Sequence, residues 1–190
     1  CPNVADWEGA FGERGDVIAF TITSGLSGSY GVACAAKESC EEHDPSRRIQ
    51  VFDSLSAGPE IALLIEKAAA ELRAGANFDT VCNVLKSYQS QTHLLFALES
   101  MHNLAHNGRV PITVAKIAGM LGIRIIGEAQ GGQIVAIHKP RGEKKAMLAM
   151  AQTIKERGFQ DGGLIRISHC FADDRIQEFL SKIREDFPHA

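Results

Sequence analysis

The sequence has 190 residues, of which 45% are hydrophobic, and a formal net charge of −3. This apolar fraction is typical of a globular protein with a buried core, and the interspersed charges argue against a nucleic-acid-binding or membrane-surface protein. The longest apolar runs are far shorter than the roughly 20 residues that a membrane span needs. Five scattered cysteines without a C-x-x-C pair favour reduced thiols in a cytoplasmic protein and argue against a structural zinc site.

The first half of the chain predicts alternating helices and strands. Residues 17–22 form a short apolar run, which is typical of a buried strand. Residues 49–54 are expected to form a second strand that ends in a polar pair. Each run is followed by a corner of small polar residues and then by a helical pattern. Two such units in succession predict a parallel sheet. The expected helices of this half cover residues 4–11, 30–40, 59–74 and 78–90.

The second half has a different pattern, with a predicted β-hairpin at its centre. Residues 123–129 and 134–139 are expected to form two strands around the Gly-Gly turn at 130–133. The other expected elements are strands at 92–98 and 164–169 and helices at 99–106, 112–121, 145–158 and 173–187. The sequence therefore predicts a two-lobed α/β fold: a parallel α/β/α lobe at residues 1–90 and an α+β lobe with an antiparallel sheet at residues 91–190.

Residues 23–29, here called the serine corner, join the first strand to the following helix. A glycine-rich corner between a strand and a helix start points backbone N–H groups and a positive helix end at an anion. Ser24, Ser27 and Ser29 add hydroxyl donors. The corner therefore indicates a site for a carboxylate or a phosphate. An equally consistent interpretation is that Ser27 or Ser29 only caps its helix.

Two enzyme-like interpretations of the same corner also remain open. Gly25 and Ser27 match the start of the nucleophile motif G-x-S-x-G, which would make Ser27 the nucleophile of a serine hydrolase, but Ser29 stands where the last glycine belongs. A phosphate or nucleotide binder is the other alternative. The chain lacks the lysine of a P-loop and any G-x-G-x-x-G.

Two further positions have side chains suited to a binding site. Asp53 and Ser54 end the second predicted strand, at the edge of the sheet where Ser24 ends the first. Asp53 could bind a metal or act as a base, and the alternative is that it hydrogen-bonds its own loop. Arg109 follows Gly108 in a turn, where its guanidinium is suited to gripping a carboxylate or phosphate. An ordinary surface arginine is the alternative.

Several motifs, taken in order, resemble those of the DegV family of bacterial fatty-acid-binding proteins, and the match runs over essentially the whole chain. The motifs are Thr-Ser-Gly-Leu-Ser-Gly-Ser-Tyr at 23–30, Val-Phe-Asp-Ser-Leu-Ser-Ala-Gly at 51–58, Asn-Gly-Arg-Val at 107–110, Gly-Gly-Gln-Ile-Val at 131–135, Lys-Pro-Arg-Gly-Glu-Lys-Lys-Ala at 139–146 and Ser-His at 168–169. The resemblance implies a two-lobed DegV-like fold that buries a long acyl chain. It also implies a fatty-acid carboxylate held by serine or threonine hydroxyls and by an arginine of the second lobe.

Matched residue by residue, the resemblance implies that Ser24, Ser27 and Arg109 bind the carboxylate. The same motifs add Thr23, Gly25, Asp53 and Ser54 as further candidates. The resemblance also implies a carrier protein with no catalytic residue, no metal and no cofactor besides the bound fatty acid. In some members of the family a separate fatty acid kinase acts on the bound fatty acid, so a kinase subunit is an expected partner.

The chain also departs from the family pattern. Cys1-Pro2 matches only the end of the family's Thr-Ser-x-Pro motif, and the sequence ends before the family's Gly-x-His-x-Gly-Pro-Gly segment. Residues 99–102 are Glu-Ser-Met-His, where the family more often has Asp-Thr-Leu. We therefore expect the chain to be a piece of a longer protein, with N- and C-terminal segments of the family missing.

Overall fold

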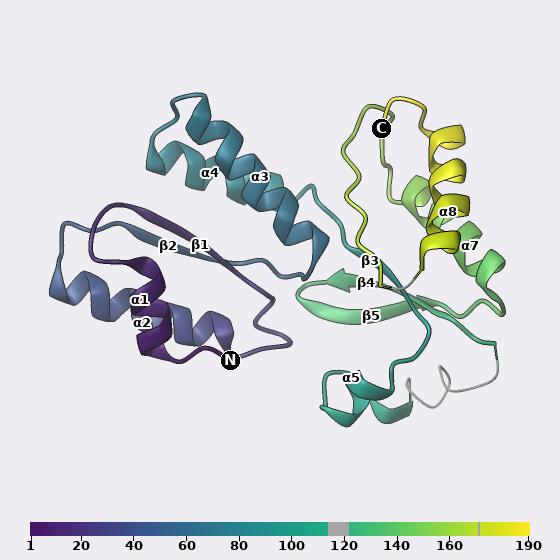
Figure 1. Ribbon diagram of the computed structural model, residues 1–190, viewed down its shortest axis with the longest axis horizontal. Helices are drawn as coiled ribbons and strands as arrows, with labels where there is room; N and C mark the ends of the chain where they lie inside the picture. Colours follow the sequence, from purple (N-terminus) through teal and green to yellow (C-terminus); the bar gives the residue numbers. More distant parts are fainter. Residues whose placement is uncertain (114–121, 171) are drawn as a thin grey trace. The chain divides into compact units, whose positions relative to one another are not determined.

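The computed structural model describes residues 1–113, 122–170 and 172–190. The chain forms two compact units (Figure 1). Unit 1 contains Cys1–Leu94 together with Ala129–Gln133, and unit 2 contains Leu95–Glu128 and Ile134–Ala190.

Unit 1 is built on two parallel strands, β1 (Val17–Thr21) and β2 (Ile49–Asp53). Their register places Val17 opposite Ile49 and Thr21 opposite Asp53, so both strands end at the same edge. Four helices accompany them: α1 (Val4–Phe11), α2 (Ser29–His43), α3 (Pro59–Arg73) and α4 (Phe78–Gln89). In Figure 1, α1 and α2 lie on one face of the strands and α3 and α4 on the other.

The alternation of side chains along β2 explains why both faces of the strands are covered. Val51 packs with Ala33 and Ala36 of α2, whereas the next residue, Phe52, packs with Val81 and Leu85 of α4. Successive side chains of a strand point to opposite faces, so a strand with apolar side chains on both faces needs helices on both sides. The predicted parallel layer is confirmed.

Local signals fix where the helices of unit 1 begin. Asn3 and Asp6 form a reciprocal capping box at the start of α1, with hydrogen bonds of 2.8 and 2.9 Å. Pro59 occupies the first turn of α3, where its missing N–H costs nothing. Asn77 caps α4 by accepting from the amide of Thr80.

Unit 2 contains a three-stranded sheet in the order β3 (Leu95–Leu98), β4 (Ile125–Gln130) and β5 (Gln133–His138). β3 and β4 are antiparallel, with Leu95 opposite Glu128. The helices are α5 (His102–His106), α7 (Glu143–Glu156) and α8 (Asp173–Asp186), and a core of Ala151, Phe179, Ile183 and Phe187 lies between α7 and α8. The antiparallel sheet, and with it the predicted fold class, is confirmed.

The predicted Gly-Gly hairpin turn lies between β4 and β5. Gly131 and Gly132 both have positive φ, 56° and 80°, which is the signature of a type I′ hairpin turn. Residues with a side chain rarely adopt positive φ at two successive positions, and glycine does so without steric cost because it has no Cβ atom. This turn belongs to unit 1, with residues Ala129–Gln133.

The strand predicted at residues 164–169 is wrong. These residues are described without strand pairing, although Ile165 and Ile167 pack against the core between α7 and α8 and Leu164 is 62% exposed. Side chains in this segment alternate between partly buried and exposed, as they would in a strand. A strand also needs a hydrogen-bonding neighbour, which alternation alone does not reveal. The helix predicted at 112–121 lies mostly outside the described residues.

Candidate functional site

The serine corner connects the end of β1 to the start of α2. The N-cap position of α2 is Gly28, and the helix begins at Ser29, so neither Ser27 nor Ser29 is the N-cap. The hydroxyl of Ser27 nevertheless accepts a hydrogen bond from the amide of Ser29 at 3.2 Å. The corner therefore partly satisfies the start of its own helix.

The backbone amides of the serine corner are mostly engaged within the protein. Besides the amide of Ser29, those of Leu26 and Ser27 donate to the carbonyl of Thr23, and that of Gly25 donates to the hydroxyl of Thr23. The amide of Ser24 donates to the carboxylate of Asp53, and the amide of Thr23 donates to the carbonyl of Ser56. This differs from the expectation that free N–H groups would face an anion. The donors that the corner can still offer to a ligand are side-chain hydroxyls, which rotate to suit a partner.

Ser27 and Ser29 form a small cluster with Cys1. Their hydroxyl oxygens are 2.9 Å apart, and the thiol sulfur of Cys1 lies 3.2 Å from each. Ser29 is buried, Ser27 is half-buried and Ser24 is exposed. The sequence indicated the serines, but it gave no signal that Cys1 lies beside them.

Residues 53–58, here called the Asp-Ser loop, follow β2 and hold the serine corner. One carboxylate oxygen of Asp53, Oδ1, accepts from the amides of Ser24 at 3.1 Å and Leu55 at 3.0 Å. The interpretation that Asp53 hydrogen-bonds its own loop is confirmed. Among the described residues, no group of three or more His, Cys, Asp or Glu side chains is arranged to hold a metal ion.

Ser54 and Ser56 are both buried in the Asp-Ser loop, each with 2% of its surface exposed. The Ser54 hydroxyl donates to the carbonyl of Ser56 at 2.9 Å and accepts from the amide of Ser56 at 3.1 Å. The hydroxyl of Ser56, by contrast, is buried without a hydrogen-bond partner among the described residues. Ser54 therefore stabilises the loop.

Thr23 links the serine corner to the hairpin turn of the same unit. It is 2% exposed, and its hydroxyl donates to the carbonyl of Gly132 at 2.9 Å while accepting from the amide of Gly25 at 3.2 Å. Its own amide donates to the carbonyl of Ser56 at 2.8 Å. Sequence reasoning did not identify Gly132 as part of the site, because the Gly-Gly pair signals only a turn.

Two glycines allow this close approach. A side chain at Gly25 would clash with the carbonyl of Gly132 and lie 2.5 Å from Nε2 of Gln133. A Cβ atom at Gly132 would lie 2.7 Å from the hydroxyl of Thr23. Both distances are shorter than real Cβ contacts, so glycine is required at both positions.

Two residues near the serine corner have unusual properties: Leu55 has a strained backbone, and Tyr30 has a raised pKa. Leu55 has a φ of 52° and is 47% exposed; this left-handed backbone is unfavourable for a bulky residue and is typical of functional loops. The pKa of Tyr30 lies above its ordinary value of 10.0, first because of a hydrogen bond with Cys34, and also because of burial and the charge of Asp53.

Arg109 belongs to unit 2. It follows Gly108, which has a positive φ of 71° and lies in the turn after α5 (His102–His106). Its amide donates to the carbonyl of Leu104 at 2.8 Å, and its Nη1 donates to the carbonyl of Asn107 at 2.6 Å. The side chain is exposed. These contacts fix the predicted helix-ending turn and leave the guanidinium at the surface of the unit.

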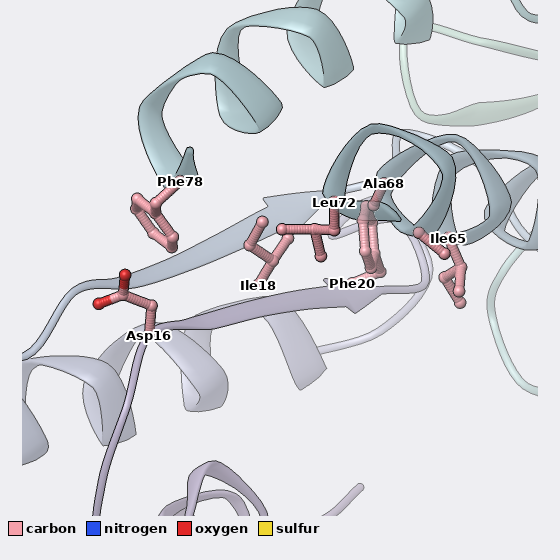
Figure 2. A pocket seen from close by; sticks show the side chains of 8 residues that line it. Asp16, Ile18, Phe20, Ile65, Ala68, Leu72 and Phe78 are labelled. Carbon is pink, nitrogen blue, oxygen red and sulfur yellow. The ribbon is translucent and has the colours of Figure 1, made fainter. Parts of the chain in front are cut away.

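Unit 1 also has an open apolar groove of about 320 Å³ between β1 and α3 (Figure 2). Ile18 and Phe20 of β1 face Ala68 and Leu72 of α3, and Asp16 is the one charged side chain in the lining. The lining does not include the serine corner. With Leu72 53% exposed, the groove is not by itself the closed cavity that the resemblance implies for an acyl chain.

The comparisons with known proteins agree on one family. A family model described as "Uncharacterised protein, DegV family" matches residues 1–190. A DegV domain-containing protein of Streptococcus gordonii is 38% identical over 191 residues, covering all of this chain and 68% of the relative. The chain therefore belongs to the DegV family and spans about two thirds of the length of this relative.

Two solved structures have the same fold. A DegV family protein from Eubacterium eligens, loaded with heptadecanoic acid, has a TM-score of 0.95 at 34% identity, covering all of this chain and 69% of that one. The Fatty Acid Kinase (Fak) B3 protein of Streptococcus pneumoniae, loaded with linoleic acid, has a TM-score of 0.96 at 36% identity, covering all of this chain and 68% of that one. Among the described residues of this chain, no helix combines the length and hydrophobicity needed to cross a membrane.

Proposed function

We propose that this chain binds a long-chain fatty acid, with the acyl chain in an apolar cavity and the carboxylate held by the hydroxyls of Ser24 and Ser27 and by the guanidinium of Arg109. The observation that carries the proposal is the serine corner, where the amides are engaged and the hydroxyls can donate to a ligand. Relatives that are 34% and 36% identical are loaded with heptadecanoic and linoleic acid, which supports a fatty acid as the ligand class.

The charge distribution favours a carboxylate over a phosphate. Asp53 places a carboxylate oxygen 3.1 Å from the amide of Ser24, directly beside the corner. A second negative charge on the ligand would increase the repulsion from Asp53. Serine hydroxyls can donate to a singly charged carboxylate, and a guanidinium matches its two oxygens.

The contacts of Ser27 favour a binding protein over a serine hydrolase. The hydrogen-bond partners of its hydroxyl among the described residues are the thiol of Cys1 and the hydroxyl and amide of Ser29. A serine nucleophile needs a general base, such as histidine, within hydrogen-bond reach.

We further propose that the bound fatty acid is presented to a separate kinase, because one relative is itself a Fatty Acid Kinase (Fak) B3 protein.

The experiment that tests the function is organic extraction and mass spectrometry of lipids that copurify with the protein expressed from its complete reading frame. We expect a fatty acid at near one equivalent, reduced in a variant with Ser24→Ala and Ser27→Ala. A protein that carries no fatty acid and takes up neither added palmitate nor oleate contradicts the proposal. Labelling of Ser27 by a fluorophosphonate probe, absent in Ser27→Ala, would instead support the hydrolase alternative.

A further inference from the structure

We propose that Thr23 is a positioning residue for the fatty-acid carboxylate site, and that it acts by hydrogen-bonding the serine corner to the hairpin turn at Gly132. This inference rests on the proposed function, because it assigns a role within that site. It makes residues 131–133, which are more than a hundred residues away along the chain, part of the machinery that shapes the corner.

The hydrogen bonds of Thr23 define its role. A threonine hydroxyl has a single proton to donate. In Thr23 that proton is directed to the carbonyl of Gly132, 2.9 Å away, and the hydroxyl oxygen accepts from the amide of Gly25. A carboxylate is only an acceptor, so binding it directly would require Thr23 to break the bond to Gly132. Thr23 is also 2% exposed, which removes it from contact with solvent.

The consequence for the ligand lies in the neighbouring serines. The carbonyl of Thr23 accepts from the amides of Leu26 and Ser27, so the position of Thr23 sets the turn that carries the Ser27 hydroxyl. The next residue, Ser24, is held by Asp53. Fixing Thr23 therefore fixes the backbone that carries both proposed hydroxyl ligands before the fatty acid arrives, and a preorganised site binds more tightly than a mobile one.

The lack of space for a side chain at Gly25 and Gly132 indicates a specific fit between the two segments and not a chance contact. A Cβ atom at either glycine would come too close to the opposite segment, with Thr23 Oγ1 only 2.7 Å from a Cβ at Gly132. Gly131, one residue earlier, also has positive φ but has no heavy atom within 4 Å of such a Cβ. Within the hairpin turn, the close contact is therefore at Gly132, the residue that accepts from Thr23, and not at Gly131.

The test compares Thr23→Val, which removes the hydroxyl at nearly constant shape, with Thr23→Ser, which keeps it. Thr21→Val is the matched control, because Thr21 is 3% exposed and also donates to a backbone carbonyl, that of Phe52 at 3.4 Å. We expect Thr23→Val to weaken binding of oleate by about tenfold or more, and Thr23→Ser and Thr21→Val to stay within about threefold of the wild type. Equal affinities of Thr23→Val and Thr21→Val for oleate would overturn the inference.

Hydrogen exchange at the Gly25 amide gives a readout that does not need the ligand. Its acceptor is the Thr23 hydroxyl, so exchange should accelerate in Thr23→Val and stay unchanged in Thr21→Val. Faster exchange with unaltered oleate affinity means that the bond is only structural, and overturns the positioning role. A wild-type protein that binds no fatty acid overturns the proposed function itself, a result distinct from any difference between variants.

A second pair of variants keeps the test decisive if Thr23→Val does not fold. Gly132→Ala and Gly131→Ala both place alanine at positive φ, but only the first meets Thr23. We expect Gly132→Ala to weaken oleate binding by about tenfold relative to Gly131→Ala. Equal binding by the two variants contradicts the inference.

Discussion

Oδ1 of Asp53 accepts the amide of Ser24 at 3.1 Å, which joins the end of β2 to the corner that follows β1. The same oxygen accepts the amide of Leu55 at 3.0 Å. One side chain thus organises two consecutive loops at the edge of the parallel sheet, where ligands bind in α/β folds. The strand register makes this contact available, because it places Asp53 opposite Thr21.

Replacing Asp53 by alanine should therefore loosen both loops. We expect Asp53→Ala to lower the free energy of unfolding by about 1–2 kcal/mol, because two amides lose their acceptor. Asp53→Asn keeps an oxygen acceptor and should cost less, about 0.5 kcal/mol. Because Asp53→Asn also removes a negative charge beside the corner, it should tighten fatty-acid binding. Urea denaturation and a binding titration measure the two effects, and equal destabilisation by both variants would refute the hydrogen-bonding role.

The two buried serines of the Asp-Ser loop should respond in opposite ways. Ser54→Ala removes a hydroxyl that bonds the carbonyl and amide of Ser56, and should destabilise the protein by about 1–3 kcal/mol. Ser56→Ala removes a buried hydroxyl with no partner among the described residues, and should be neutral or stabilising by up to about 1 kcal/mol. Thermal melts of the two variants at one protein concentration provide the comparison, and the prediction fails if Ser56→Ala is the more harmful change.

Arg109→Ala tests the cationic part of the proposed carboxylate site. The side chain is exposed, so its loss should leave the free energy of unfolding within about 0.5 kcal/mol of the wild type. We expect affinity for palmitate to fall at least about tenfold, which corresponds to one lost charge-assisted hydrogen bond. Arg184→Ala on α8, another exposed arginine of unit 2, is the control for net charge. Similar affinities of the two variants would remove Arg109 from the site.

A pH-dependent prediction concerns Asp186 at the end of α8. It lies 2.8 Å from Lys155 of α7 and 3.1 Å from Lys182. The hydrogen bond from Lys155, followed by that from Lys182, lowers the pKa of Asp186 below its ordinary value of 3.8. A depressed carboxyl pKa stabilises the fold above the ordinary value, and this stabilisation is lost as the pH falls through the lowered pKa.

Asp186→Asn should therefore lower the melting temperature at about pH 7, and the difference from the wild type should shrink as the pH approaches about 2. Glu185→Gln is the matched control, because the Glu185 side chain is 72% exposed, against 10% for Asp186, and forms an ion pair of 3.1 Å with Lys182. We expect a smaller effect from Glu185→Gln. A loss from Asp186→Asn that persists at the lowest pH contradicts the ionic explanation.

The sequence predicted the features that depend on local pattern. The segment that contains Val51 and Phe52 predicted a strand of a parallel layer, and the Gly131-Gly132 pair predicted the hairpin turn; both are confirmed. Ile165 and Ile167 are partly buried, but the strand predicted for residues 164–169 is absent. Strand pairing depends on a neighbour elsewhere in the chain, which alternation does not encode.

The candidate site was predictable to a similar extent. The order of hydroxyl and glycine residues indicated the serine corner and the Asp-Ser loop. The bond between Thr23 and Gly132 could not be predicted, because its partners are 109 residues apart and a buried threonine looks like any core residue in the sequence. Likewise, the engagement of the corner's amides depends on the fold of the loop and not on its composition.

The most direct test of the central claim is a titration of the delipidated protein, expressed from its complete reading frame, with palmitate and with palmitic acid methyl ester. The two ligands have the same acyl chain, and only palmitate carries the carboxylate that the serine hydroxyls and Arg109 are proposed to hold. The account predicts saturable, stoichiometric binding of palmitate and at least about tenfold weaker binding of the ester. Equal affinity for both ligands, or no binding of palmitate, would contradict it.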